Sequence, residues 1–313
     1  MPEQIRNPQS AIRNRKAFAK LNLCLEIIGR REDNYHEITS VMQAIDLHDT
    51  LEFALAEEGV LTLECDSPEL STEGDSNLVM KAARLLQKAA GINLGAHITL
   101  HKQIPLAAGM GGGSSDAAAT LLGLSDLWGL RIGKGDLLEL AGMLGSDVPF
   151  FLEGPTALVE GRGERVTRIP SPPPGWAVLV CPRYDLKDKT KQLFSYITSA
   201  DHSEGIVTHR LIAALVAGTF PDSALLYNAF ERVAYTIFEN LLARRGAIMR
   251  TSGRDVHLSG SGPTLYTLYP AAEEAHARRL HANLQAAGLR TYLSGLVVGK
   301  GSGIRDQGLG IRD

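Results

Sequence analysis

A glycine-rich stretch at residues 105–116 constrains this 313-residue chain more than any other feature. It consists of Pro-Leu-Ala-Ala-Gly-Met-Gly-Gly-Gly-Ser-Ser-Asp. The residues before it, 97–104, place apolar side chains at alternate positions, which predicts a strand. The residues after it, 117–124, are small or apolar helix formers. The glycines therefore connect a strand to the start of a helix.

A helix that starts after glycines is suited to hold an anion. Its first N–H groups have no partner within the helix and lie at the positive end of the helix dipole. Glycine lets a phosphate approach closely because it has no Cβ, and Ser114 and Ser115 add hydroxyl groups. A turn without a ligand is the alternative. The Walker and Rossmann patterns do not fit, because no lysine follows the glycines and Ser114 occupies the third Rossmann glycine position.

The pattern Pro-x-x-x-Gly-x-Gly-Gly-Gly-Ser-Ser resembles the ATP loop of the GHMP kinase superfamily. Three further stretches resemble one of its families, the 4-diphosphocytidyl-2-C-methyl-D-erythritol kinases: Ala-Lys-Leu-Asn-Leu at 19–23, Gly-Arg-Arg-Glu-Asp-Asn-Tyr-His-Glu at 29–37 and Gly-Ser-Asp-Val-Pro-Phe-Phe at 145–151. The resemblance runs from about Lys16 to about Gly299. It implies a two-domain α+β fold with the active site in the cleft between the domains. The implied reaction is ATP-dependent phosphorylation of the 2-hydroxyl of the cytidine-diphosphate-linked methylerythritol, in the non-mevalonate route to isoprenoids.

The resemblance also implies which residues bind ATP. They are Asn77, Leu78, Lys102, Pro105, Gly109, Gly111, Gly112, Gly113, Ser114 and Ser115. Leu78 also opens an amphipathic helix, so core packing explains part of its pattern. An ATP donor implies Mg²⁺, but no carboxylate cage is visible in the sequence. Either Ser115 contacts the ion, or phosphates and water hold most of it. Asp116 is interpreted as a helix N-terminal charge.

Phosphoryl transfer requires an oriented hydroxyl group and charges that stabilise the transferred group. Asp147 is a polar residue beside the apolar run 148–151, and the pattern alone also allows it to cap a turn or a helix. Lys20 and Asn22 share one face of an apolar strand, which is alternatively a solvent-facing side. The resemblance implies that Asp147 accepts the proton of the hydroxyl or orients it. It also implies that Lys20 pairs with Asp147 and that Asn22 binds the substrate.

A nucleobase site is implied at Tyr35 and His36. The resemblance implies that the ring of Tyr35 stacks on cytosine, an interaction of about 1–3 kcal/mol, and that His36 binds the edge of the base. An ordinary loop is the alternative. Phe194 is implied to face Tyr35 across the base, with Thr190 nearby, although a core position explains Phe194 equally well. Asn34 stands where the family usually has glycine, and asparagine tolerates a positive φ.

Composition limits the partners that we expect. The net charge of −3 and the 44% hydrophobic content fit a globular protein and suggest neither nucleic acid nor membrane. The resemblance implies a small-molecule substrate instead. No signal peptide or membrane-spanning run is visible, so we expect a cytoplasmic monomer or homodimer. Cys24, Cys65 and Cys181 are far apart and predict reduced thiols rather than a metal site.

The Pro/Gly cluster at 170–175 divides the chain. We expect an extension at 1–16, an N-terminal domain at 17–170, a C-terminal domain at 171–299 and a disordered tail at 300–313. Alternatively, the cluster is a loop within one domain. Predicted strands lie near 17–28, 40–45, 50–55, 60–65, 97–104, 176–181, 255–259, 264–269 and 290–298, and predicted helices near 77–90, 114–127, 135–144, 189–199, 207–217, 223–244 and 271–287. A second glycine loop at 258–263 either shapes the cleft or forms a tight turn.

Overall fold

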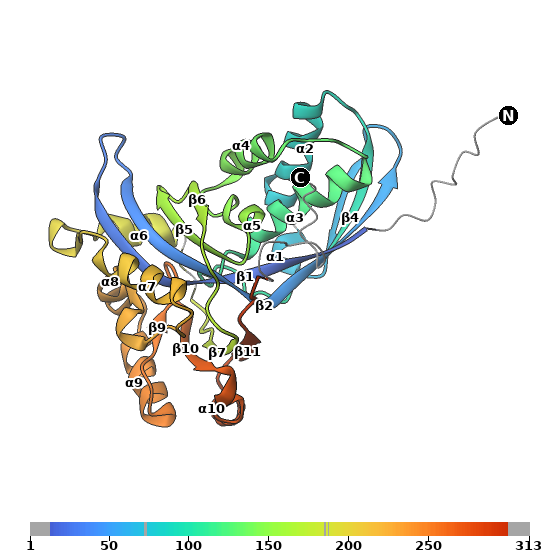
Figure 1. The fold of residues 1–313 in the computed structure, drawn as a ribbon. Coiled ribbons are helices and arrows are strands. Elements are labelled where there is room, and N and C mark those ends of the chain that lie inside the picture. Colours follow the sequence, from blue (N-terminus) through green and yellow to red (C-terminus); the bar gives the residue numbers. More distant parts are fainter. Residues whose placement is uncertain (1–12, 72–73, 185, 187, 300–313) are drawn as a thin grey trace.

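The computed structural model describes residues 13–71, 74–184, 186 and 188–299 (Figure 1). Of the predicted extension at 1–16, residues 13–16 are described, and they belong to the first strand. The predicted tail at 300–313 lies outside the described residues.

Two long antiparallel strands, β1 (Arg13–Arg30) and β2 (His36–Ala56), run across the width of the molecule (Figure 1). They pair from Arg13 opposite Phe53 to Arg30 opposite His36. Around them lies a seven-stranded sheet, in which the order β3-β4-β2-β1-β8 is extended by β5 on β2 and β6 on β5. Its other strands are β3 (Leu61–Cys65), β4 (Gly95–His101), β5 (Thr156–Gly161), β6 (Arg165–Arg168) and β8 (Tyr227–Asn228).

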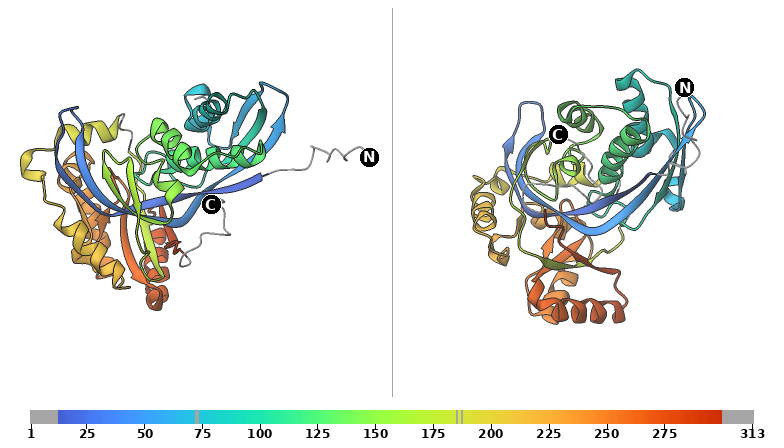
Figure 2. Two further views of the ribbon diagram at one scale, coloured as in Figure 1. Left: turned by 45° about the horizontal axis from the view of Figure 1, so that its top comes forward. Right: turned by 45° about the vertical axis from the view of Figure 1, so that its right-hand side comes forward.

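A second sheet belongs to the C-terminal half and has the order β11-β7-β10-β9. Its strands are β7 (Gly175–Val180), β9 (His257–Leu258), β10 (Leu265–Pro270) and β11 (Thr291–Gly295). The helices of the first half are α1 (Pro68–Ser71), η2 (Gly74–Ser76), α2 (Leu78–Ala90), α3 (Gly112–Leu127), α4 (Lys134–Leu144) and α5 (Phe150–Glu153). In the second half they are α6 (Lys189–Ser195), η3 (Ser199–Asp201), α7 (Ile206–Val216), η4 (Ser223–Leu225), α8 (Glu231–Ile237), α9 (Leu241–Ser252), η5 (Ala271–Glu273) and α10 (Glu274–Ala286). Helices α2, α3 and α4 lie on one side of the β1–β2 pair and α9 and α10 on the other, as the views in Figures 1 and 2 show.

Helix α3 packs closely on the first sheet because its residues are small. A Cβ at Gly123 would lie 2.3 Å from the ring of Phe53 on β2, so only glycine permits this approach. The alanines of the same helix are buried in the core formed with β2, β4 and α2. This packing fixes the start of α3, and with it the glycine loop, against the middle of β1.

The two halves of the chain are joined by main-chain hydrogen bonds. β8, from the second half, pairs with β1 in parallel at Cys24–Tyr227 and Leu25–Asn228. On the other side of the sheet, the N–H of Val297 donates to the carbonyl of Ala44 at 3.0 Å. The middle of β1 is therefore enclosed by both halves.

Two predicted elements differ from the structure, and a third element was not predicted. β2 is one continuous strand where two short strands were expected: its pairing with β1 shifts register opposite Phe18 and Ala19, where Asp46 and Leu47 have no partner on β1, and resumes at His48. The single helix expected at 223–244 is divided into η4, β8, α8 and α9, since pairing with β1 outweighs the local helical pattern. The β5–β6 hairpin was not expected, although its Gly161-Arg162-Gly163 turn is typical of a hairpin.

Candidate active site

A cleft of about 1580 Å³ lies between the two halves. It continues along β1 from the glycine loop to the β1–β2 hairpin. The predicted site residues that line it are Lys20, Asn22, Tyr35, His36, Leu78, Lys102, Pro105, Gly109, Gly111, Gly112, Gly113, Ser114, Asp147, Thr190 and Phe194. Sequence reasoning thus placed most of its candidates in one continuous space.

The glycine loop lies directly beside β1. The N–H of Lys20 donates to the carbonyl of Met110 at 2.9 Å, which joins the loop to the strand. Gly109 and Gly111 have φ values of 81° and 70°, where a side chain is strained. α3 begins at Gly112, so its first N–H groups open towards the cleft. This arrangement has the geometry that the sequence predicted for an anion site.

The second glycine loop, 258–263, packs on the first. It connects β9 to β10 as a tight turn, and it also shapes the cleft, so both interpretations of this loop hold. A Cβ on Gly109 would lie 2.5 Å from the carbonyl oxygen of Ser259 and 2.8 Å from that of Gly262. The two loops therefore touch backbone to backbone.

Lys20 and Asp147 meet at this point of the cleft. The Lys20 ammonium lies 3.5 Å from the Asp147 carboxylate, and the exposed fractions of the two side chains are 4% and 33%. The solvent-facing interpretation of this strand face is therefore wrong. Asp147 belongs to the turn between α4 and α5, and the N-cap residue of α5 is Pro149, which makes no side-chain cap bond. The carboxylate is thus held open towards the cleft.

Asn22 orients the lysine. Its side-chain oxygen accepts a hydrogen bond from Lys20 Nζ at 2.6 Å, and its Nδ2 donates to Ser40 Oγ at 2.8 Å. Ser40 in turn donates to the carbonyl of Cys24 at 2.6 Å. This chain of hydrogen bonds is buried, so the position of the ammonium is fixed before any ligand binds.

Lys102 lies beneath the start of α3 in an unexpected network. Its ammonium donates to Asp116 at 2.7 Å and also to Asp49. Burial alone would lower the pKa of Lys102, but the two carboxylates outweigh this effect and raise it. Burial also raises the pKa of Asp116 to about 7, although Lys102 acts in the opposite direction. Asp116 is therefore a buried partner of Lys102 rather than a simple helix N-terminal charge.

Two predicted ATP residues have other surroundings. The side chain of Asn77 caps α2 by accepting from the N–H of Val79 at 2.9 Å. Ser115 is buried and lines a cavity of about 30 Å³ together with Phe150 and Phe151, behind the glycine loop. Ser114 is the serine that lines the cleft.

The aromatic end of the cleft lies at the β1–β2 hairpin and α6. His36 stacks on Phe194 with ring centroids 4.9 Å apart, whereas the ring of Tyr35 lies under the guanidinium of Arg162 at 4.9 Å. Burial, followed by the charges of His202 and Arg30, lowers the pKa of His36, so its ring is neutral at pH 7. Asn34 adopts a φ of 67°, as its expected turn requires.

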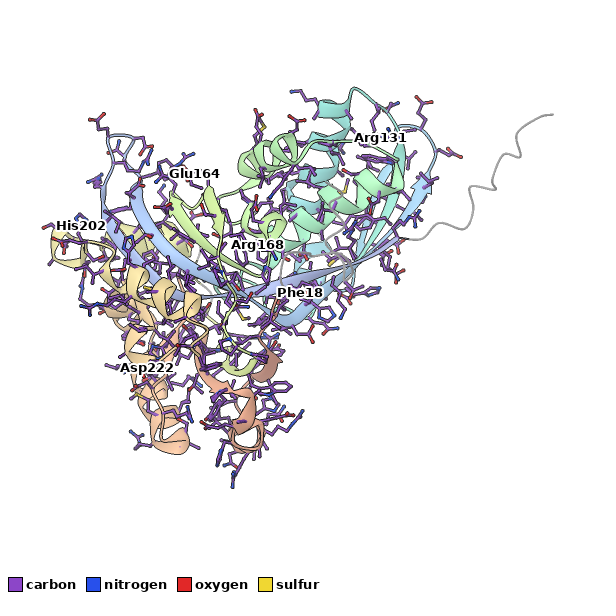
Figure 3. All side chains as sticks on the ribbon, viewed as in Figure 1. Phe18, Arg131, Glu164, Arg168, His202 and Asp222 are labelled. Carbon is purple, nitrogen blue, oxygen red and sulfur yellow. The ribbon has the colours of Figure 1, made fainter. Side chains whose placement is uncertain are left out.

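Sequence reasoning missed two residues of this end, Arg162 and His202. Arg162 belongs to the β5–β6 turn next to Glu164, and His202 follows η3 (Figure 3). The glycines on both sides of Arg162 could have indicated a hairpin tip. No pattern around His202 distinguishes it from a surface loop.

The donor groups do not form a metal cage. Among the described residues, no group of three or more His, Cys, Asp or Glu side chains could hold an ion. Asp49 and Asp116, which lie behind the glycine loop, already bind Lys102. A magnesium ion in this cleft would therefore depend mainly on nucleotide phosphates and water, with Asp147 and Ser114 among the residues with side-chain oxygens that line the space.

Comparison with known proteins agrees with this geometry. Residues 77–155 match the model of the GHMP kinases N terminal domain. A 4-diphosphocytidyl-2-C-methyl-D-erythritol kinase of Dehalococcoides mccartyi is 39% identical over 278 residues, which cover 88% of this chain and 95% of the relative. A crystal structure of 4-(cytidine 5'-diphospho)-2C-methyl-D-erythritol kinase aligns with a TM-score of 0.76 and 36% identity, over 92% of this chain and 100% of the other.

A homoserine kinase from Cytophaga hutchinsonii also aligns, with a TM-score of 0.70 and 19% identity over 95% of this chain and 97% of the other, and this likeness shows the fold alone. The fold and the cleft are those of a GHMP-type small-molecule kinase, as predicted. Within that class, the chain belongs to the family of 4-diphosphocytidyl-2-C-methyl-D-erythritol kinases. The predictions of α+β fold, family and enzyme class are confirmed.

The described part of the chain contains no helix with the length and apolar character that crossing a bilayer requires. Cys24, Cys65 and Cys181 are all free thiols.

Proposed function

We propose that this protein transfers the γ-phosphoryl group of ATP to the 2-hydroxyl of 4-diphosphocytidyl-2-C-methyl-D-erythritol. The products are ADP and the 2-phosphate, in the non-mevalonate route to isoprenoids. One observation carries the proposal: a single cleft holds the glycine loop near the Lys20–Asp147 pair and an aromatic cluster farther along β1. A nucleotide-linked alcohol fills such a cleft with its base at the aromatic end and its hydroxyl beside Asp147.

The geometry around Lys20 supports the catalytic roles that we propose. Asp147 accepts the proton of the substrate hydroxyl, or orients that hydroxyl towards the γ-phosphate. Lys20 neutralises charge near the transferred phosphoryl group, and the side chain of Asn22 holds the Lys20 ammonium in place. Because the lysine is already buried and bound, little reorganisation is needed when the substrate arrives.

ATP is the phosphoryl donor, and the glycine loop is its phosphate site. The N–H groups at the start of α3 and the hydroxyl of Ser114 face the phosphates, while Leu78 borders the loop. Magnesium, when bound with the nucleotide, neutralises phosphate charge. Lys102 stabilises the start of α3 by its hydrogen bond to Asp116, and Asn77 stabilises the start of α2 by accepting from the N–H of Val79.

Cytosine recognition is assigned to Tyr35, His36 and Phe194. A neutral imidazole offers one donor and one acceptor to the edge of a base. His36 and Phe194 are stacked on each other, so binding moves one of these rings or places the base on the exposed face of Tyr35. Thr190 lies nearby and bonds Ser261 at 3.0 Å. Small alcohols such as homoserine would leave this end of the cleft empty.

The test is ADP formation with ATP and Mg²⁺, with the cytidine-diphosphate-linked methylerythritol, mevalonate and homoserine offered in parallel. We expect turnover of the first alone, without release of carbon dioxide. Turnover of another alcohol would overturn the substrate assignment, and decarboxylation of diphosphomevalonate would overturn the reaction class. The three free thiols fit a reducing compartment, which we propose is the cytoplasm.

A further inference from the structure

Lys189, the first residue of α6, lies at the junction of the two glycine loops and has no assigned role. Its ammonium donates to the carbonyl of Ala107 at 2.6 Å and also to the carbonyl of Gly262. Ala107 belongs to the loop beside α3, and Gly262 belongs to the loop between β9 and β10. One side chain from the second half thus binds both loops at once.

The two loops approach each other closely, and the first contains a residue with an unfavourable backbone conformation. Ala107 has a φ of 51°, which is uncommon for a residue with a Cβ, and Gly109 and Gly262 have φ values of 81° and 69°. Their backbones already touch, since a Cβ on Gly109 would lie 2.9 Å from the nitrogen of Gly262. A charge-assisted hydrogen bond to each loop stabilises this approach more than a neutral donor would.

The charge of Lys189 is not neutralised by an acid in the part of the chain that the structure describes. Both recorded acceptors are main-chain oxygens. Burial, followed by the charge of Lys20, lowers the pKa of Lys189 to about 8. The other charged side chains that line the cleft are Lys20, Arg30, Asp33, Lys102, Asp147, Arg162, Asp188 and Lys191. Lys189 can therefore lose its proton under mildly alkaline conditions.

We propose that Lys189 is a positioning residue that fastens the first glycine loop to the second and so sets the shape of the phosphate site. This inference rests on the proposed function of that loop in binding ATP. Removal of the ammonium lets the two loops separate and weakens the cradle for the phosphates. Lys20 and Asp147 lie on β1 and in the turn before α5. We expect their geometry to change little, because the bonds from Asn22 and Ser40 that hold the Lys20 ammonium involve neither Ala107 nor Gly262.

The test compares Lys189→Met with Lys189→Arg. We expect Lys189→Met to raise the KM for ATP about tenfold, the effect of one such interaction on an equilibrium constant, with a much smaller change in kcat. In the wild type, the KM for ATP should rise above about pH 8 as the lysine loses its proton. The arginine of Lys189→Arg stays charged above pH 8, so the KM for ATP of this variant should not rise with pH.

Lys81→Met, on the exposed side of α2, is the matched control and should leave every parameter unchanged. Direct ATP titration and thermal melting of each variant separate binding from folding. Normal ATP affinity of folded Lys189→Met would overturn the proposal and leave the kinase function intact. An alkaline rise that persists in Lys189→Arg would overturn it as well. Absence of turnover in the wild type would instead contradict the proposed function, while the titration still tests Lys189.

Discussion

At the scale of single residues, the site depends on polar side chains buried in apolar elements. Lys20 and Asn22 are almost wholly buried on β1, although Lys and Asn usually lie at the surface. Such burial is costly unless each polar atom has a partner, and the bonds to Asp147 and Ser40 supply these partners. These two unusually buried polar residues are thus among those to which we assign roles in catalysis.

The role of Asp147 is tested by Asp147→Asn, which keeps the shape of the side chain and removes its negative charge. We expect kcat to fall by about 10²–10⁴-fold, the usual contribution of a general base, with little change in either KM. Steady-state kinetics measure this effect. Asp136→Asn, an exposed residue in the first turn of α4, is the control. An equal loss in the control, or a loss confined to KM, would contradict the assigned role.

Residue patterns predicted some of this site and not the rest. Alternation along β1 indicated that Lys20 and Asn22 share a face, but it could not show that the face is buried, because the second glycine loop, from far along the chain, lies against these two side chains. Asp116 has the sequence position of a helix N-terminal charge, and only Lys102, from the segment after β4, gives it a buried partner. Lys189 follows a stretch with little family resemblance, so no motif indicated its contacts.

At the scale of elements, the glycine loops are arranged by close backbone contact. The sequence predicted the strand, the loop and the helix in the correct order. It did not predict that a second loop, about 150 residues later, would lie on Gly109; the hydrogen bond from Ser259 Oγ to the Gly109 carbonyl has a sequence separation of 150. Contacts of this kind depend on tertiary packing and leave no local pattern.

This packing makes Gly109→Ala a specific test of the loop contact. The new Cβ would lie 2.5 Å from the Ser259 carbonyl oxygen at a φ of 81°, so the loops must separate. Strain of this kind costs about 1–3 kcal/mol, and we expect the affinity for ATP to fall about tenfold or more. Equilibrium titration with ATP measures the loss.

The matched control for that substitution is Gly142→Ala in α4, where a Cβ meets no atom within 4 Å. We expect it to stabilise the protein by about 0.5–1 kcal/mol, because alanine favours the helix, and to leave ATP binding unchanged. Unchanged ATP affinity in Gly109→Ala would show that the two loops do not need to touch.

At the scale of the whole molecule, three distant segments are held together by buried charges. Asp49 on β2, Lys102 after β4 and Asp116 on α3 meet beneath the phosphate site. Asp49 also accepts from the N–H groups of Gln103 and Ile104 at 2.6 and 2.8 Å, whereas Oδ1 of Asp116 is buried and has no hydrogen-bond partner among the described residues. One lysine between two carboxylates leaves an excess negative charge in the core.

This excess charge predicts how stability depends on pH. The pKa of Asp116 is about 7 in the folded protein, against an ordinary value of 3.8. Between these two values the folded state binds a proton that the unfolded state has lost, so this group stabilises the fold as the pH falls from about 7 towards 4. That contribution is lost again as the pH rises through 7.

Asp116→Asn removes the titrating group and leaves Lys102 paired with Asp49. We expect the Tm of the wild type, measured relative to this variant, to be about 5–10 °C higher at pH 5 than at pH 8, because two pH units below the folded pKa correspond to about 2.7 kcal/mol. Thermal melting across this pH range checks the difference, and Glu58→Gln at an exposed position is the control. If the Tm of the wild type and that of Asp116→Asn change with pH in the same way, Asp116 stays ionised in the folded protein. That result would contradict the prediction.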